Sequence, residues 1–179
     1  LCGEVQKEVI ETTLINDHGI NVHFSEMTTI CIERPIGIGN GLESGDRGDP
    51  YLGTVGLRIE PAAIGSGVRY QLTTDVTGKM PAAFYIAIEE TIPKVLQQGL
   101  YGWEVTDCVV ILTQVHYWPR QSHAHARFDK SMSSTAGDFR IMTTLAVMQA
   151  LAQAKTAVHE PLNRFELDIP ETALATVMQ

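Results

Sequence analysis

One stretch of the sequence, VTDCVVILTQV at residues 105–115, constrains the fold more than any other. Its continuous centre of Val, Ile and Leu predicts a strand that is covered on at least one face. A long polar segment at residues 116–140 follows it directly, and apolar residues at helical spacing begin near the end of that segment. We therefore expect a central strand that runs into a polar loop and then into a covering helix.

The other periodic segments predict the elements around this strand. Residues 3–16 place apolar residues at helical spacing, and Gly19 suits the left-handed cap that ends such a helix. Residues 81–98 predict another helix, with Pro81 in its first turn and Pro93 inside it. Shorter segments predict further strands at residues 19–24, 28–33, 52–59, 68–74 and 164–169.

The glycine-rich, acidic residues 36–50 predict a loop, and residues 135–155 predict the covering helix. Thr135 and Asp138 have the spacing of a capping pair at its start. The buried stripe expected on this helix consists of Ile141, Leu145, Met148 and Leu151. The predicted fold class is α+β, with helices on one face of a four-stranded sheet.

The composition limits the function classes. Apolar residues make up 44% and charged residues 19%, as in a globular domain, and there is neither a membrane-spanning run nor a secretory signal. The net charge of -8 argues against general nucleic-acid binding, because phosphate contact depends on Lys and Arg. Cys2, Cys31 and Cys108 suggest neither a disulfide framework nor a zinc cluster, so a cytoplasmic location is expected. A start at Leu1 predicts a piece of a longer protein.

The histidines of the polar segment raise the question of a metal or catalytic site. His123 and His125 could share a metal ion, but zinc requires three or four ligands, and no Cys or Glu pair lies at suitable spacing nearby. Ser122 beside His123 does not make a catalytic set. Solvated loop histidines are the simpler interpretation, so we predict no catalytic residue and no metal site. A small metal-dependent enzyme using His116, His123 and His125 is the alternative from another class.

RNA contact is the remaining interpretation of the polar segment. Residues 120–130 carry a local net charge of +2, and aromatic residues precede them. Unpaired bases stack on aromatic rings, while guanidinium and ammonium groups bind phosphates. A surface loop without a partner is the competing interpretation. The candidate RNA-binding residues are Tyr117, Trp118, Pro119, Arg120, His123, His125, Arg127 and Lys130.

Several motifs resemble one family. GEVQKEVIETTL resembles the end of domain III of elongation factor G-like translational GTPases, and TTICIERP resembles the beginning of their domain IV. IEETIPKVLQQGLYGWEVTDCVV, then DFR and HEPLNRFEL, resemble the tetracycline-resistance ribosomal protection proteins. The segment QGLYGW-VTDC is the most specific part, and the matches together span nearly the whole chain.

This resemblance implies both a fold and a function. Residues 1–26 would end domain III, residues 27–160 would form domain IV with a ribosomal protein S5 domain 2-like fold, and residues 161–179 would start domain V. The chain would be the ribosome-binding arm of a cytoplasmic GTPase that releases tetracycline from the decoding region. The implied partners are the 70S ribosome and its 16S rRNA, with no membrane and no DNA. GTP and Mg²⁺ would bind in a GTPase domain elsewhere, so no cofactor and no enzymatic activity are expected of this chain.

The chain departs from the family at one position that matters. In the ribosomal protection proteins an aromatic-Ser-Pro element after the fourth strand enters the tetracycline site. Tyr117, Trp118 and Pro119 stand there in this sequence, with Trp118 in place of the serine. An elongation factor G-like translocation factor without a drug-resistance role is therefore a second interpretation.

Overall fold

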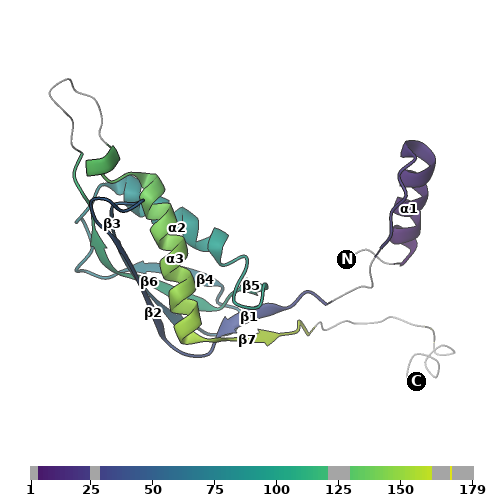
Figure 1. Cartoon of the computed structure of the whole chain (residues 1–179). Helices are drawn as coiled ribbons and strands as arrows, with labels where there is room; N and C mark the ends of the chain where they lie inside the picture. The colour runs from purple at the N-terminus through teal and green to yellow at the C-terminus, as the bar shows by residue number, and fades with distance from the viewer. Residues whose placement is uncertain (1–3, 25–28, 121–129, 163–169, 171–179) are drawn as a thin grey trace.

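The structure, a computed structural model, describes residues 4–24, 29–120, 130–162 and 170 (Figure 1). The elements follow in the order α1 (Glu4–His18), β1 (Ile32–Pro35), β2 (Gly39–Gly45), β3 (Gly53–Pro61), β4 (Val68–Leu72), α2 (Ala82–Val95), β5 (Glu104–Val105), β6 (Cys108–His116), the 3₁₀ turn η1 (Lys130–Met132), α3 (Ala136–Ala154) and β7 (Thr156–His159).

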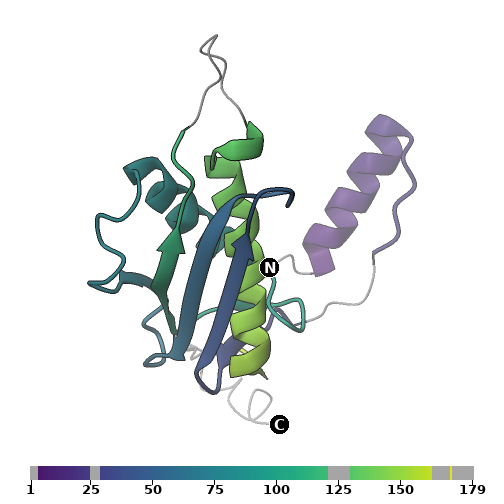
Figure 2. The same cartoon turned by 60° about the vertical axis from the view of Figure 1, so that its left-hand side comes forward.

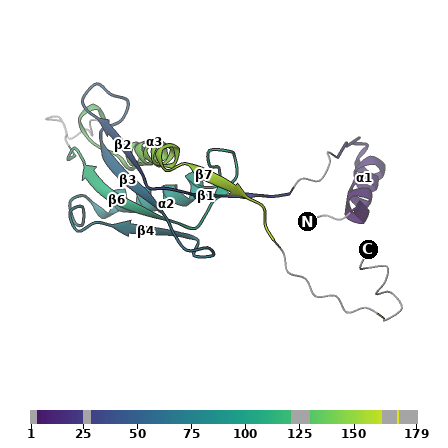
Figure 3. The same cartoon turned by 90° about the horizontal axis from the view of Figure 1, so that it is seen from below.

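A four-stranded sheet in the order β2-β3-β6-β4 forms the middle of the molecule. β2, β3 and β6 are antiparallel neighbours, whereas β4 is parallel to β6, with α2 between them in the chain. α3 packs on β2 and β3, and α2 packs beside α3 (Figure 3). A smaller sheet, β5-β1-β7, lies at the end of the domain nearest to α1 (Figure 1). The α+β fold class is confirmed.

One hydrophobic core joins the two helices to the sheet. Leu57 and Leu112 from the strands, Ile88 and Ile92 from α2, and Phe139 from α3 are all fully buried. Burying a side chain of this size contributes roughly 1.5–3 kcal/mol. The helix predicted over residues 81–98 therefore forms, although it ends at Val95, with Leu96 as its C-cap.

The predicted loop at residues 36–50 is wrong over Gly39–Gly45, which forms β2. The glycines permit a very close approach to α3. A Cβ added at Gly39 would lie 1.9 Å from the Ala150 carbonyl oxygen, and one at Gly41 would lie 1.9 Å from that of Ala146. The glycines thus mark a strand in direct contact with a helix backbone rather than a flexible segment.

The same contact overturns the stripe predicted on α3. Ile141 and Leu145 are 50% and 41% exposed, because they lie on the outer face of the helix. Small residues, Ala146 and Ala150 among them, are buried instead and face β2. The predicted stripe is therefore wrong at Ile141 and Leu145, whereas Met148 packs against the core. Leu151 is buried as expected.

Three predicted strands also differ from the structure. Residues 19–24 form no strand, and the strand expected at residues 28–33 instead begins at Ile32 and includes the Arg34-Pro35 pair that was expected to close it. The long strand at residues 105–115 is divided into β5 and β6, because Asp107 has a φ of 54°. β7 was not predicted, and the strand expected at residues 164–169 lies outside the described residues.

A buried carboxylate explains why the Gly99–Trp103 turn is so specific in sequence. Glu33 is fully buried on β1 and accepts hydrogen bonds from the backbone N–H groups of Leu100, Tyr101 and Trp103, at 2.9, 2.7 and 3.1 Å. A Cβ at Gly99 would lie 2.5 Å from the carboxylate. The motif therefore wraps a short turn around one buried charge, since an ionised carboxylate can accept several hydrogen bonds.

Candidate nucleic-acid interface

Three segments meet at the end of the molecule remote from the smaller sheet. They are the β2–β3 connection, the residues that follow β6, and the residues that precede α3 (Figure 2). The first two come from neighbouring antiparallel strands, and the third is brought beside them because α3 packs on those strands. The predicted RNA-binding residues that the structure describes lie on the second and third segments.

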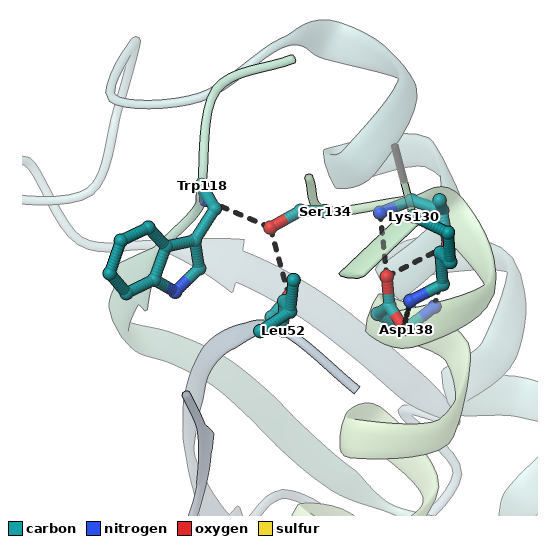
Figure 4. Close-up of polar contacts among 6 residues, drawn as sticks. Leu52, Trp118, Lys130, Ser134 and Asp138 are labelled. Carbon is teal, nitrogen blue, oxygen red and sulfur yellow. Dashed lines mark hydrogen bonds and ion pairs between the residues drawn. The ribbon is translucent and has the colours of Figure 1, made fainter. Parts of the chain in front are cut away.

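The backbone of Trp118 is held on both sides by Ser134 (Figure 4). Its N–H donates to Ser134 Oγ at 2.8 Å, and its carbonyl accepts from the Ser134 N–H at 3.0 Å. Ser134 Oγ in turn donates to the Leu52 carbonyl at 2.9 Å. Because Ser134 is only 8% exposed, these hydrogen bonds lie away from competing water. One hydroxyl thus joins all three segments.

The two predicted aromatic residues have different surroundings. Tyr117 packs against the core, with its ring centroid 5.9 Å from that of Phe84. Trp118 is half-buried, and its ring is nearly perpendicular to that of His116, at 84° with centroids 5.9 Å apart. Trp118 is thus a partly open ring on a fixed backbone, while much of Tyr117 serves to pack the base of the site. Pro119 and Arg120 are exposed.

Lys130 has a structural partner that the sequence did not indicate. Its Nζ lies 2.7 Å from Asp138 Oδ1, and Asp138 is only 2% exposed. Asp138 Oδ2 accepts from the Thr135 backbone N–H at 2.7 Å and completes the predicted capping box with the Thr135 hydroxyl. The Lys130 side chain is 49% exposed, so its ammonium both compensates a buried carboxylate and stays accessible. His123, His125 and Arg127 lie outside the described residues.

The acidic residues at the end of β2 and in the β2–β3 connection accept hydrogen bonds from nearby donors. Tyr51 Oη donates to Glu43 at 2.9 Å, and this hydrogen bond, with burial, raises the pKa of the phenol. The Asp49 carboxylate accepts from the Asp46 N–H at 2.7 Å. Between them, Arg47 places its guanidinium carbon 5.4 Å from the centroid of the Trp118 ring. Sequence reasoning missed Arg47, because the Arg47-Gly48-Asp49 tripeptide was treated as a chance match and its loop as too acidic to bind phosphate.

Other features of the described residues lie away from this end of the molecule. Within those ranges no group of three or more His, Cys, Asp or Glu side chains could hold a metal ion. Cys108 is fully buried, and burial raises the pKa of its thiol to about 11, as expected of a core residue. A surface hollow of about 950 Å³ lies between α2 and α3, and none of the predicted RNA-binding residues lines it. None of the described helices has the length and apolarity needed to span a bilayer.

Comparison with known proteins gives consistent results. The chain is 42% identical to the tetracycline resistance protein TetP of Clostridium perfringens over 176 residues, which are 98% of this chain and 25% of that protein. It is 38% identical to the oxytetracycline resistance protein of Streptomyces rimosus and 39% identical to TetM of Streptomyces lividans, over 99% of this chain and 26% of each relative. The chain thus spans about a quarter of the length of these relatives.

A crystal structure of a Thermus thermophilus protein shares the fold. It has a TM-score of 0.59 and 24% identity, and the match covers 87% of this chain and 22% of that one. The family model described as elongation factor G, domain IV, matches residues 31–155. This range contains the four-stranded sheet, α2 and α3, and the resemblance inferred from the sequence motifs is confirmed. The chain belongs to the elongation factor G domain IV family.

Proposed function

We propose that this chain is the ribosome-binding arm of a translational GTPase that releases tetracycline from the decoding region of the small subunit. The observation that carries the proposal is its 42% identity, over 98% of its length, to a protein named for tetracycline resistance. In the intact protein, GTP and Mg²⁺ would bind in a domain outside this chain. The arm itself would act by stabilising a ribosome state that tetracycline cannot occupy, which requires differential affinity for two states.

The partners proposed for the arm are the 70S ribosome and its 16S rRNA, in the cytoplasm. Trp118 offers a partly open ring on a fixed backbone, and bases stack on such rings. Exposed Pro119 and Arg120 lie beside it, and Lys130 reaches the same end of the molecule. His123, His125 and Arg127 complete the proposed surface, and Tyr117 supports it from the core side.

The negative total charge is compatible with this proposal. Charges separated by more than roughly 10 Å are largely screened at ordinary salt concentrations, so the local charge at the end of the arm decides contact with phosphates. We also propose that residues 27–160 form the arm, with residues 1–26 and 161–179 belonging to the adjoining domains III and V. The family match at residues 31–155 lies inside the first range and supports it.

A chimera tests the proposal. The matched segment of C. perfringens TetP is replaced by this chain, and the hybrid is expressed in a tetracycline-susceptible host. We expect the hybrid to confer resistance. Replacement of Trp118 and Pro119 by Gly should abolish resistance while ribosome-dependent GTP turnover continues. Tyr117 is left unchanged because it packs against the core. Gln71→Ala, on the exposed edge strand β4, serves as the control substitution.

Two results would contradict the proposal. The first is a hybrid that accumulates normally but confers no resistance. The second is resistance that survives the loss of Trp118 and Pro119. In either case a translocation assay without drug tests the alternative, in which the arm belongs to an elongation factor G-like translocation factor. A stoichiometric metal in the purified chain would instead favour the enzyme that uses His116, His123 and His125.

A further inference from the structure

Arg47 and Trp118 form a cation–π pair between two segments at the end of the molecule remote from the smaller sheet. The guanidinium carbon lies 5.4 Å from the centroid of the Trp118 ring, within the separation of about 6 Å at which such pairs are attractive. Arg47 belongs to the connection between β2 and β3, whereas Trp118 follows β6. Two loops that are distant in sequence therefore present one cation and one ring side by side.

Both partners rest on the same hydrogen-bonded unit. Ser134 Oγ accepts from the Trp118 N–H at 2.8 Å and donates to the Leu52 carbonyl at 2.9 Å (Figure 4). Leu52 is the residue that ends the Arg47 connection before β3 begins. Since Leu52 is 2% exposed and Ser134 is 8% exposed, this unit is part of the buried interior. The buried hydrogen bonds of Ser134 thus fix the distance between the backbones of the two segments.

The turn that carries Arg47 directs its carboxylates to its own backbone. Asp46 Oδ1 accepts from the Arg47 N–H at 2.6 Å, and Asp49 Oδ2 accepts from the Asp46 N–H at 2.7 Å. A further hydrogen bond, from the Asp49 N–H to the Asp46 carbonyl at 3.0 Å, closes the turn. In the part of the chain that the structure describes, the Arg47 guanidinium forms no ion pair, although three carboxylates lie in or beside its loop.

We infer that Arg47 is a positioning residue for Trp118 and that the two side chains together bind one unpaired RNA nucleotide. This inference rests on the proposed function and names the chemistry of the partner. The base would stack on the indole ring, and the phosphate of the same nucleotide would accept hydrogen bonds from the guanidinium, whose planar donors suit phosphate geometry. An acidic protein segment would bind the Arg47 guanidinium but would not require the Trp118 ring, so RNA is the partner that uses both side chains.

Fluorescence of Trp118 tests the inference directly. The sequence has two tryptophans, so Trp103→Phe leaves Trp118 as the only tryptophan, and selective excitation of the indole separates its emission from that of the tyrosines. In that background the chain is titrated with a short single-stranded oligoadenylate RNA. Arg47→Ala and Arg47→Lys are compared with Arg69→Ala, which removes an exposed arginine paired in register with Val109 at the far end of β6. Inorganic polyphosphate serves as a polyanion without bases.

The expected results distinguish the contribution of the Arg47 cation to RNA binding from that of the Trp118 ring. Without RNA, Arg47→Ala should shift the Trp118 emission, whereas Arg69→Ala should not. With RNA, Arg47→Ala should weaken binding about tenfold, as expected for loss of a charge-assisted hydrogen bond. It should also reduce the magnitude of the negative slope of log affinity against log salt concentration by about 0.7. Arg47→Lys should keep the slope but recover only part of the affinity, because an ammonium lacks the planar fork.

Three outcomes would overturn parts of this picture separately. If Arg47→Ala and Arg69→Ala have equal effects on emission and on RNA affinity, Arg47 has no positioning role, and the proposed function still stands. If RNA does not alter the emission of the Trp103→Phe chain in which Arg47 is kept, the nucleotide assignment and the proposed RNA contact at Trp118 both fail. If polyphosphate binds as tightly as RNA and Trp118→Ala changes neither affinity, the pair binds anions rather than nucleotides.

Discussion

Trp118 and Ser134 exchange two hydrogen bonds, at 2.8 and 3.0 Å, and so close the base of the segment between β6 and α3. The ring that we propose to meet RNA therefore starts from a backbone position defined by the core rather than by the loop beyond it. A stacking surface gains affinity when it is ordered before binding, because less conformational entropy is lost in the complex.

We expect Ser134→Ala to destabilise the fold by about 1–3 kcal/mol, the usual result of leaving buried hydrogen-bonding groups without a partner. The groups concerned are the Trp118 N–H and the Leu52 carbonyl. Urea unfolding followed by circular dichroism measures the change. Gln71→Ala, at an exposed position on β4, should stay within about 0.5 kcal/mol. Equal effects of the two substitutions would show that Ser134 does not hold the site together.

Gly41→Ala should be far more damaging. The new methyl carbon would lie 1.9 Å from the Ala146 carbonyl oxygen, so β2 and α3 would have to separate. We expect a loss above roughly 3 kcal/mol, beyond the range of ordinary overpacking, or failure to fold.

Gly137→Ala is the matched control for this change, since its nearest new contact is an ordinary 3.5 Å. It lies in the first turn of α3, where Ala is the better helix former by up to about 1 kcal/mol. Thermal unfolding of both variants decides the comparison. A Gly41→Ala protein as stable as the Gly137→Ala protein would refute the close packing of β2 on α3.

Removal of Asp138 should cost more than removal of Lys130. Asp138→Ala breaks the capping box and the ion pair together, and loss of a cap alone costs about 0.5–2 kcal/mol. Lys130→Ala should cost under about 1 kcal/mol, because its ammonium is half-exposed and screened by solvent. A double-mutant cycle in urea measures their coupling. If Lys130→Ala proves the more costly change, the ion pair does more than compensate Asp138.

Acid stability should depend on Asp107. Burial alone would raise the pKa of this carboxyl, but hydrogen bonds from the Gly65 and Gly67 backbone and the Arg34 guanidinium at 2.6 Å together lower it below 3.8. A lowered folded-state pKa adds stability above the unfolded-state pKa, and this stability is lost as the pH falls through the folded-state value.

Arg34→Gln should therefore raise the pKa of Asp107 and move acid unfolding to higher pH. Circular dichroism against pH, from neutral to about pH 2, measures the midpoint over the range in which carboxyls titrate. Asp107→Asn keeps the shape of the side chain and tolerates the φ of 54°, so it is the control without a titrating group. A midpoint that does not change in Arg34→Gln would show that the ion pair contributes little.

Sequence reasoning succeeded where the signal is local. The capping box of Thr135 and Asp138 depends on residues three positions apart, and the cap at Gly19 depends on one turn of α1. Both were predicted correctly. The long apolar strand was also found, although the backbone at Asp107 divides it, because a single residue with positive φ leaves no mark in an apolar pattern.

It failed where the cause is distant in the chain. The glycines of β2 make sense only beside Ala146 and Ala150, which lie more than a hundred positions later. Ile141 was placed on the buried face of the helix for the same reason, but it is exposed because the small residues face β2 instead. Arg47 was missed for a related reason, since only the folded structure brings it over Trp118.

The glycine contacts of β2 also have a mechanical meaning. Gly39 and Gly41 place no side chain between the strand and the C-terminal half of α3, and Gly37, just before β2, lies close to Ala154, so the strand and this half of the helix are held together. The C-terminal end of α3 leads directly into β7, which pairs with β1 in the smaller sheet. We therefore expect β2 and the C-terminal half of α3 to move as one rigid unit.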